Sequence, residues 1–227
     1  MTTTIRASYL RLAMTCMARG DIRYYLCAVR IEPREEGGAF IVATDGHCLI
    51  AIIDEKGVCD VPVLICPDRV TAAQLPKVGS SRDTDEAKVS IEAYGSSIAL
   101  KVTDKDGVPT HLQIRATTVE GNFPDWRKVV PKFADLKPGF IDPVNPTYPP
   151  RVLPALCDKH PAMQPFQAVR GGGVVYRLEA HRTVLFIVMP RREATDPAPW
   201  MKTWEQKPPT IAEAVADAQV AGTEVPA

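Results

Sequence analysis

The side chains best suited to chemistry stand together in one short string, Asp45-Gly46-His47-Cys48. A carboxylate, an imidazole and a thiol can form a nucleophile with its base, or ligands for a metal ion. His47 and Cys48 are neighbours in a predicted strand, so their side chains point to opposite faces and cannot converge on one substrate without a bulge. The string therefore favours a structural role over a catalytic one.

Other patterns typical of enzymes are missing from the sequence. It has four histidines and no Cys-x-x-Cys or His-Glu-x-x-His pattern, so we expect no metal site. Gly171–Gly173 precede a predicted strand, whereas phosphate-binding glycines precede a helix, and no Gly-x-Ser-x-Gly string is present. Glu35 and Glu36 fall in a predicted solvated turn. We therefore expect no catalytic residues and no cofactor.

The composition predicts a globular protein of one or two domains. Its 227 residues, 45% of them hydrophobic, are enough to bury a core. Lys and Arg number 27, as do Asp and Glu, so no strong overall field attracts nucleic acid or an anionic membrane. Residues 193–227 hold six acids and two lysines, which leaves 25 basic and 21 acidic residues before them. The chain thus divides into a body of about +4 and a tail of about −4.

The location of the protein follows from its apolar segments and its cysteines. The N-terminus lacks the long apolar run of a signal peptide, and no later segment approaches the ~18 apolar residues of a membrane span. The six cysteines lie mostly within apolar patterns, which favours reduced, buried thiols. We predict a soluble, cytoplasmic protein.

The hydrophobic pattern predicts one order of elements, a strand and a helix followed by three strands, and repeats it. The first copy has a strand at 4–6, a helix at 9–19 and strands at 23–32, 39–44 and 47–53. The second has a strand at 63–66, a helix at 67–75 and strands at 88–94, 97–104 and 110–119. A third, degraded copy has strands at 139–142, 166–169, 174–180 and 184–189 and a short helix at 150–158 that contains Pro154.

Four strings of the sequence resemble the bacterial DNA polymerase sliding clamp family, the β processivity factor. They are Ile22–Leu26 (IRYYL), Val42–Leu49 (VATDGHCL), Val119–Pro131 (VEGNFPDWRKVVP) and Phe186–Arg191 (FIVMPR). The strings follow the family's order, and the resemblance covers roughly residues 5–192. Cys48 stands where the family usually has Arg, and Trp126 where it has Tyr. The chain is a shortened variant, with three repeated units where the family has six.

The resemblance implies an α+β fold of clamp units, in which helices line the inside of a ring and antiparallel sheets form the outside. About three β-α-β-β-β units make up the chain. Residues 1–58 and 59–131 resemble the two halves of the central clamp domain, and 132–192 resemble the C-terminal half of the last domain. Residues 193–227 form an acidic tail that we expect to be flexible, unless Trp200 and Trp204 cover an apolar patch or recruit a partner.

The family's function implies a protein that is not an enzyme and encircles double-stranded DNA without reading its sequence. Cations on the inner helices would then lie near phosphates. The candidates are Arg6, Arg11, Arg19, Arg69, Lys77, Arg151 and Lys159. Arg23, Tyr24 and Tyr25 match the family's loop at the edge of the hole, where an aromatic pair beside an Arg can stack on bases and bind phosphate.

The resemblance also implies an outer hydrophobic pocket that binds short peptides ending in Leu and Phe. DNA polymerase and other replication or repair proteins carry such peptides in the family. One wall would use Leu26, Thr44, Gly46, His47 and Leu49, the second wall Pro124, Lys128 and Val129, and the floor Val188, Met189 and Pro190. We call this set the predicted pocket. Val188 and Met189 fit a core strand equally well.

The assembly follows from the number of units. The family's rings contain twelve, so three units per chain imply a head-to-tail homotetramer, with a homodimer or a monomer as alternatives. A second functional hypothesis is a clamp-like interaction protein that binds clamp partners without encircling DNA. A third is an enzyme that uses Asp45, His47 and Cys48.

Overall fold

The structure is a computed structural model that describes residues 3–80, 86–94, 97–138, 141–158 and 162–191. All of these residues belong to one unit that extends to Arg191. The predicted acidic tail at 193–227 and the candidate Lys159 lie outside the described residues.

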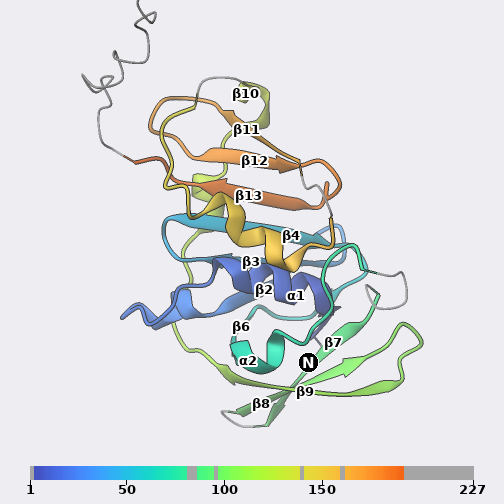
Figure 1. Cartoon of the computed structure of the whole chain (residues 1–227). Coiled ribbons are helices and arrows are strands. Elements are labelled where there is room, and N and C mark those ends of the chain that lie inside the picture. Colours follow the sequence, from blue (N-terminus) through green and yellow to red (C-terminus); the bar gives the residue numbers. More distant parts are fainter. Residues whose placement is uncertain (1–2, 81–85, 95–96, 139–140, 159–161, 192–227) are drawn as a thin grey trace, which may run out of the picture. The chain divides into compact units, whose positions relative to one another are not determined.

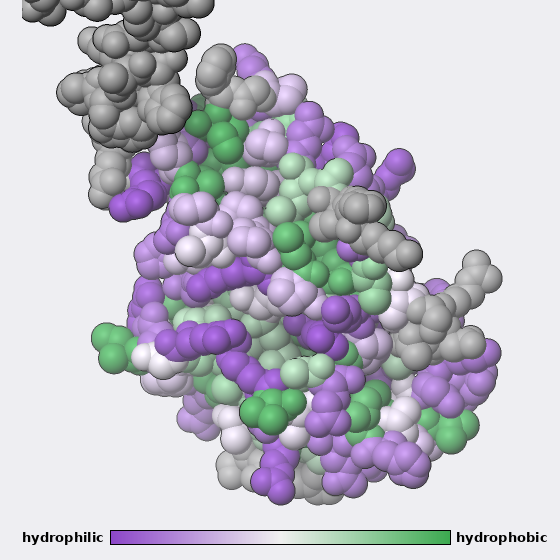
Figure 2. Space-filling model, in the orientation of Figure 1, coloured by the Kyte–Doolittle hydropathy of each residue, from purple (hydrophilic) through white to green (hydrophobic). Residues whose placement is uncertain are grey.

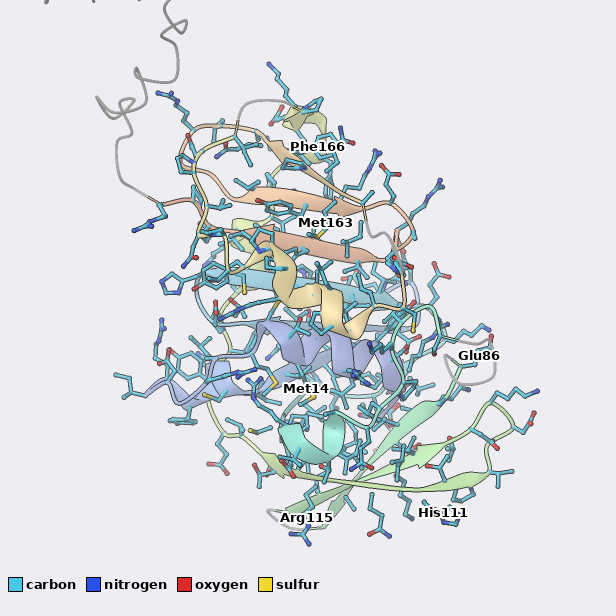
Figure 3. The ribbon with its side chains drawn as sticks, viewed as in Figure 1. Met14, Glu86, His111, Arg115, Met163 and Phe166 are labelled. Atoms are coloured by element: carbon cyan, nitrogen blue, oxygen red, sulfur yellow. The ribbon has the colours of Figure 1, made fainter. Side chains whose placement is uncertain are left out.

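The described strands form a single sheet in which every pair of neighbours is antiparallel (Figure 1). Their bounds are β1 (Thr3–Arg6), β2 (Val29–Pro33), β3 (Ala39–Thr44), β4 (Cys48–Asp54), β5 (Val58–Cys59), β6 (Val63–Pro67), β7 (Lys88–Tyr94), β8 (Ser97–Thr103), β9 (Pro109–Thr118), β10 (Lys137–Pro138), β11 (Met163–Gln167), β12 (Val174–Leu178) and β13 (Val184–Val188). The order across the sheet is β10-β11-β12-β13-β4-β3-β2-β6-β9-β8-β7-β1-β5. In Figure 3, Met163 and Phe166 of β11 lie near the top of the view, and His111 and Arg115 of β9 lie near the bottom.

The helices are short, and several are 3-10 turns. The α-helices are α1 (Ala7–Ala13) and α2 (Arg69–Ala72), and the 3-10 turns are η1 (Met14–Cys16), η2 (Tyr24–Cys27), η3 (Trp126–Val129), η4 (Phe133–Asp135) and η5 (Pro149–Ala155). Figure 1 shows α1, α2 and the gold ribbon of η5 on the same side of the sheet. We call this side of the sheet the inner face and the opposite side the outer face.

Three stretches of the chain repeat a similar order of elements, and strands of one stretch pair with strands of another. The first runs from β1 to β4, the second from β6 to β9, and the third holds η5 with β11 to β13. β1 pairs with β7 of the second stretch, and β6 pairs with β2 of the first. The third stretch joins the first where β13 pairs with β4, from Val184 opposite Ile52 to Val188 opposite Cys48. The unit boundaries at 58, 131 and 192 remain a prediction.

Alternation along the central strands divides the buried side chains between two clusters. The inner cluster includes Leu10 and Leu12 of α1 together with Ile50 and Phe186, each 1% exposed or less. The outer cluster packs Val42, Leu49, Ala51 and Ile187 against Phe123 and Trp126, which come from the segment after β9. The sheet is therefore apolar on both faces at the junction of β4 and β13.

The structure corrects several predicted elements. The strand predicted at 23–32 begins only at Val29, because Asp21 accepts hydrogen bonds from the Arg23 backbone and guanidinium and the chain turns into η2. The helix predicted at 9–19 is α-helical only to Ala13 and ends in η1. The helix predicted at 150–158 is the 3-10 turn η5, whose prolines lack the amide donors of an α-helix.

The third stretch also departs from the predicted strands. The strand predicted at 166–169 is β11, which ends at Gln167 because Val169 accepts the turn hydrogen bond from Gly172. Of the strand predicted at 139–142, residues 139–140 lie outside the described residues, and Ile141 and Asp142 are not in a strand. The strands predicted at 39–44 and 88–94 are confirmed with the same bounds as β3 and β7.

Candidate functional site

The turn between β3 and β4 places the string Asp45-Gly46-His47 at the junction with β13. The Asp45 carboxylate accepts hydrogen bonds from the backbone N–H groups of His47 and Cys48, both at 2.9 Å. Gly46 has a φ of 89°, in the region where residues other than glycine are strained. The Met189 N–H donates to the His47 carbonyl at 2.8 Å. This bond holds the turn against the segment that follows β13.

The second predicted wall reaches the same junction through the chain after β9. Trp126 is buried, packs its ring 5.5 Å from that of Phe40, and donates its indole N–H to Glu32 at 3.2 Å. Gly173 lies between the second wall and the floor of the predicted pocket. A Cβ atom built on Gly173 would lie 3.6 Å from the Sδ of Met189, on the floor, and 3.8 Å from the carbonyl oxygen of Val129, on the wall. The structure therefore brings Val129 and Met189 together.

The predicted pocket residues divide into a reachable set and a buried set. Gly46, His47, Pro124, Lys128 and Val129 are exposed, and Met189 and Pro190 are partly exposed. Leu26, Thr44, Leu49 and Val188 are buried. Val188 has no exposed surface and belongs to the inner cluster, so it forms core and not an accessible floor. The Thr44 hydroxyl is used within the turn, where it donates to the Cys48 carbonyl at 2.7 Å.

Arg23 connects the two sites that the sequence assigns separately. Its guanidinium packs against Gly46. A Cβ atom built on Gly46 would lie only 3.4 Å from the Nη1 atom of Arg23. Asp21 holds the guanidinium at 2.7 Å, and this hydrogen bond lowers the pKa of Asp21 to about 2. Tyr25 packs close to Gly121, while Tyr24 and Ile22 are exposed, Ile22 by 95%. The predicted DNA-contacting loop thus borders the predicted pocket.

Two of the candidate DNA-binding arginines also tie the inner helices together. Arg69 donates to the carbonyl groups of Met17 and Ala18 at 3.1 and 2.9 Å, and its burial lowers its pKa. Arg11 donates to the Leu75 carbonyl. Carbonyl oxygens do not neutralise a guanidinium, so both side chains keep their positive charge on the inner face.

Arg151 links the inner face to the turn of the predicted pocket. It lies on η5, forms an ion pair with Asp45 at 2.5 Å and packs 4.5 Å over the ring of Tyr148. The Tyr148 ring stacks in turn on His47, with centroids 6.1 Å apart. Burial favours a raised pKa for Asp45, but the N–H groups of Cys48 and His47 and the Arg151 guanidinium hold that pKa below its usual value. Sequence reasoning missed Tyr148, because it lies about 100 residues from His47 along the chain.

The remaining candidate cations lie apart from this network. Arg6 packs 4.7 Å over the ring of Tyr9, Arg19 is exposed, and Lys77 is partly exposed. Figure 2 shows strongly hydrophilic residues crossing the face that carries the helices, between apolar patches. This inner face therefore offers dispersed polar groups instead of one basic cluster.

The geometry of the string at 45–48 does not form a nucleophile with its base. Cys48 is 1% exposed and faces the inner cluster, where a hydrogen bond with Cys16 and burial raise the pKa of the Cys48 thiol. Asp45 is occupied by Arg151 and by backbone N–H groups. Within the described ranges, no three His, Cys, Asp or Glu side chains are grouped to hold a metal ion, and no helix is long and apolar enough to cross a membrane.

Comparison with known proteins gives the fold. No protein-family model matches the chain, and no curated protein matches it. The DNA polymerase sliding clamp of Pseudomonas aeruginosa matches with a TM-score of 0.57 and 17% identity over 85% of this chain and 66% of that chain. The Bacillus subtilis clamp gives 0.57 and 14% over 86% and 65%. A putative DNA polymerase III beta subunit of Eubacterium rectale gives 0.59 and 10% over 85% and 66%.

These matches confirm the predicted α+β clamp fold. The chain spans slightly less than two thirds of the length of the clamps it matches, which is consistent with a shortened variant.

The network around Asp45 predicts a pH-dependent contribution to stability. A carboxylate whose pKa is lowered by folding stabilises the native state above the unfolded pKa, and this contribution is lost as the pH falls through the folded value. Asp45→Asn should therefore lower the free energy of unfolding by about 1–2 kcal/mol at pH 7 and by less at pH 3. Urea denaturation at both pH values measures the difference.

Asp125→Asn is the matched control, because its ion pair with Lys128 is exposed, and it should change stability little at either pH. An equal loss for Asp45→Asn at pH 7 and pH 3 would show that the ion pair does not hold the turn.

Proposed function

We propose that this protein is a DNA sliding clamp that is not an enzyme, encircles double-stranded DNA as a ring, and tethers DNA polymerase or other replication and repair proteins. The observation that carries the proposal is the continuous antiparallel sheet, which passes from the first stretch to the third through β4 and β13 with the helices on one face. This is the arrangement in which units add end to end to form a wall with helices inside. The clamp fold of the matched structures supports it.

The DNA contacts of this ring are electrostatic and independent of sequence. Arg11 and Arg69 keep their charge while their side chains are held by carbonyl groups, and Arg19 and Lys77 lie at the surface. Such cations contact phosphates without reading bases, so the affinity falls as salt rises. Arg151 contributes less to this charge because Asp45 pairs with it.

The outer contacts use the reachable part of the predicted pocket. His47, Val129 and Met189 surround a surface beneath which Leu49 and Ile187 are buried. A peptide ending in Leu and Phe finds apolar contacts there, and Met adapts to varied side chains. A peptide that approaches Gly46 from the side of its Cα hydrogens meets the Arg23 guanidinium.

We propose that ring closure uses two uncovered strand edges, one along part of β9 and one at the β10 end of the sheet. β6 covers β9 only at Ala116–Thr118, so Pro109–Gln113 has no strand on that side among the described residues. We propose that this edge joins the β10–β11 end of the next copy, and that four chains complete the ring.

One observation favours the alternative of a clamp-like protein that binds partners without enclosing DNA. β10, at the far end of the sheet, is only two residues long and includes Pro138, which lacks a backbone N–H. Short edges that contain proline resist strand addition.

DNA topology distinguishes the two functions. The protein is diluted, mixed with nicked circular plasmid and re-concentrated so that rings close around the DNA, and gel filtration then separates bound from free protein. A clamp should remain on the circle at moderate salt and run off once the plasmid is cut, because a linear molecule has ends. Equal release from circular and linear DNA would contradict enclosure and favour the alternative.

Val129→Asp tests the predicted pocket. Val129 is 39% exposed, so the substitution should spare the fold while it places a charge on the apolar wall. The affinity for a fluorescent peptide ending in Leu and Phe, measured by anisotropy, should fall about ten-fold. Val108→Asp, 58% exposed in the turn between β8 and β9, is the control and should leave the affinity unchanged. The same affinity in both variants would place the peptide elsewhere.

A further inference from the structure

A groove of about 980 Å³ opens on the outer face, separate from the predicted pocket. Strands β3, β4, β11, β12 and β13 form its floor, and the segment from η3 to η4 forms one side. None of the predicted pocket residues lines it. The turn at 126–130 divides the two surfaces, because Val129 belongs to the predicted pocket while Trp126 and Val130 line the groove. Its volume is at the upper end of the range of ligand pockets.

The groove is hollow because small side chains lie between large ones. Ala51 and Val175 are on the floor, and Phe40, Trp126 and Phe166 rise beside them. Phe133 stands at the mouth with 63% of its surface exposed. An exposed aromatic beside an apolar hollow is a common feature of surfaces that bind another chain.

The rim of the groove carries more positive than negative charge. Arg127, Arg177 and Arg182 line it, with Glu179 as the one carboxylate in the lining. Arg127 packs 4.4 Å over the ring of Trp126, and Arg177 packs 5.5 Å over that of Phe166. Arg182 is exposed and has no ion pair among the described residues. Arg127 and Arg177 are therefore held above aromatic rings at the edge of an apolar floor.

We propose that this groove binds a short acidic segment of a partner protein that inserts two large apolar side chains. The aliphatic floor removes those side chains from water, while the guanidinium groups bind the flanking carboxylates. The rim already binds carboxylates in this way, since Glu32 pairs with Arg127 at 2.7 Å and Glu179 pairs with Arg177. Arg182 has no ion pair in the part of the chain that the structure describes, so its guanidinium is the one best placed to bind a carboxylate of the segment.

The groove is independent of the proposed clamp activity, and its partner can be bound together with a peptide in the predicted pocket. Such a surface lets one subunit hold two segments of one partner, or two partners, on either side of the turn at 126–130.

Two synthetic peptides of about ten residues test the proposal. Both carry one tryptophan and one isoleucine as anchors, and their remaining residues are aspartate and glycine in one and lysine and glycine in the other. Fluorescence anisotropy with the full chain should show saturable binding of the acidic peptide, at least ten-fold tighter than the basic one and weaker at high salt. An excess of the peptide ending in Leu and Phe should not displace it.

Two variants at exposed positions locate the binding without risk to the core. Arg182→Glu and Phe133→Ala should each weaken the acidic peptide about five-fold. Arg170→Glu and Val169→Ala, exposed by 99% and 66% outside the groove, are the matched controls and should bind as the parent protein does.

The proposal is overturned by equal affinity for the acidic and basic peptides, by unchanged binding in both groove variants, or by displacement with the Leu and Phe peptide. Binding of oligothymidine that depends on Arg182 and Phe133 would also overturn it, in favour of nucleic acid. The predicted pocket is probed separately by Val129→Asp, so the failure of one proposal leaves the other open.

Discussion

The antiparallel pairing of β13 with β4 is the interaction on which the rest of the structure depends. It joins residues more than 130 positions apart, Val184 to Ile52 and Val188 to Cys48, and so connects the third stretch of chain to the first. Side chains on both faces of this junction are buried, Phe186 and Ile50 among the inner helices and Ile187 and Leu49 under Trp126. Without this pairing the sheet would end at β4, and neither outer surface would have its second side.

The junction also brings together groups that the sequence assigns to separate sites. Arg151, on the inner face, holds Asp45 in the turn of the predicted pocket, and Arg23 lies against Gly46 in the same turn. A phosphate that withdrew Arg151 from Asp45 would remove one of the turn's supports. The inner and outer surfaces are thus connected through a few charged side chains whose positions depend on the sheet between them.

Much of the fold was predictable, because hydrophobic alternation and turn residues mark strands directly. β3 and β7 have the predicted bounds. The predicted elements are wrong where particular side-chain contacts or prolines override the hydrophobic pattern. The hydrogen bonds between Asp21 and Arg23 turn an apparent strand into η2, and prolines change η5 from an α-helix to a 3-10 turn. Val188 was predicted to form the floor of the pocket, but its side chain points to the inner face of the sheet and belongs to the inner cluster. The groove was not predicted, because its lining residues come from segments that are far apart in the sequence and share no motif.

The mass of the assembly in solution tests the central claim most directly, since a wall of three repeats must continue into other copies in order to enclose DNA. Light scattering coupled to gel filtration, at micromolar concentration and moderate salt, measures it without a partner. We predict a particle of four times the chain mass of 24.8 kDa. A single species at one or two chain masses would contradict the ring.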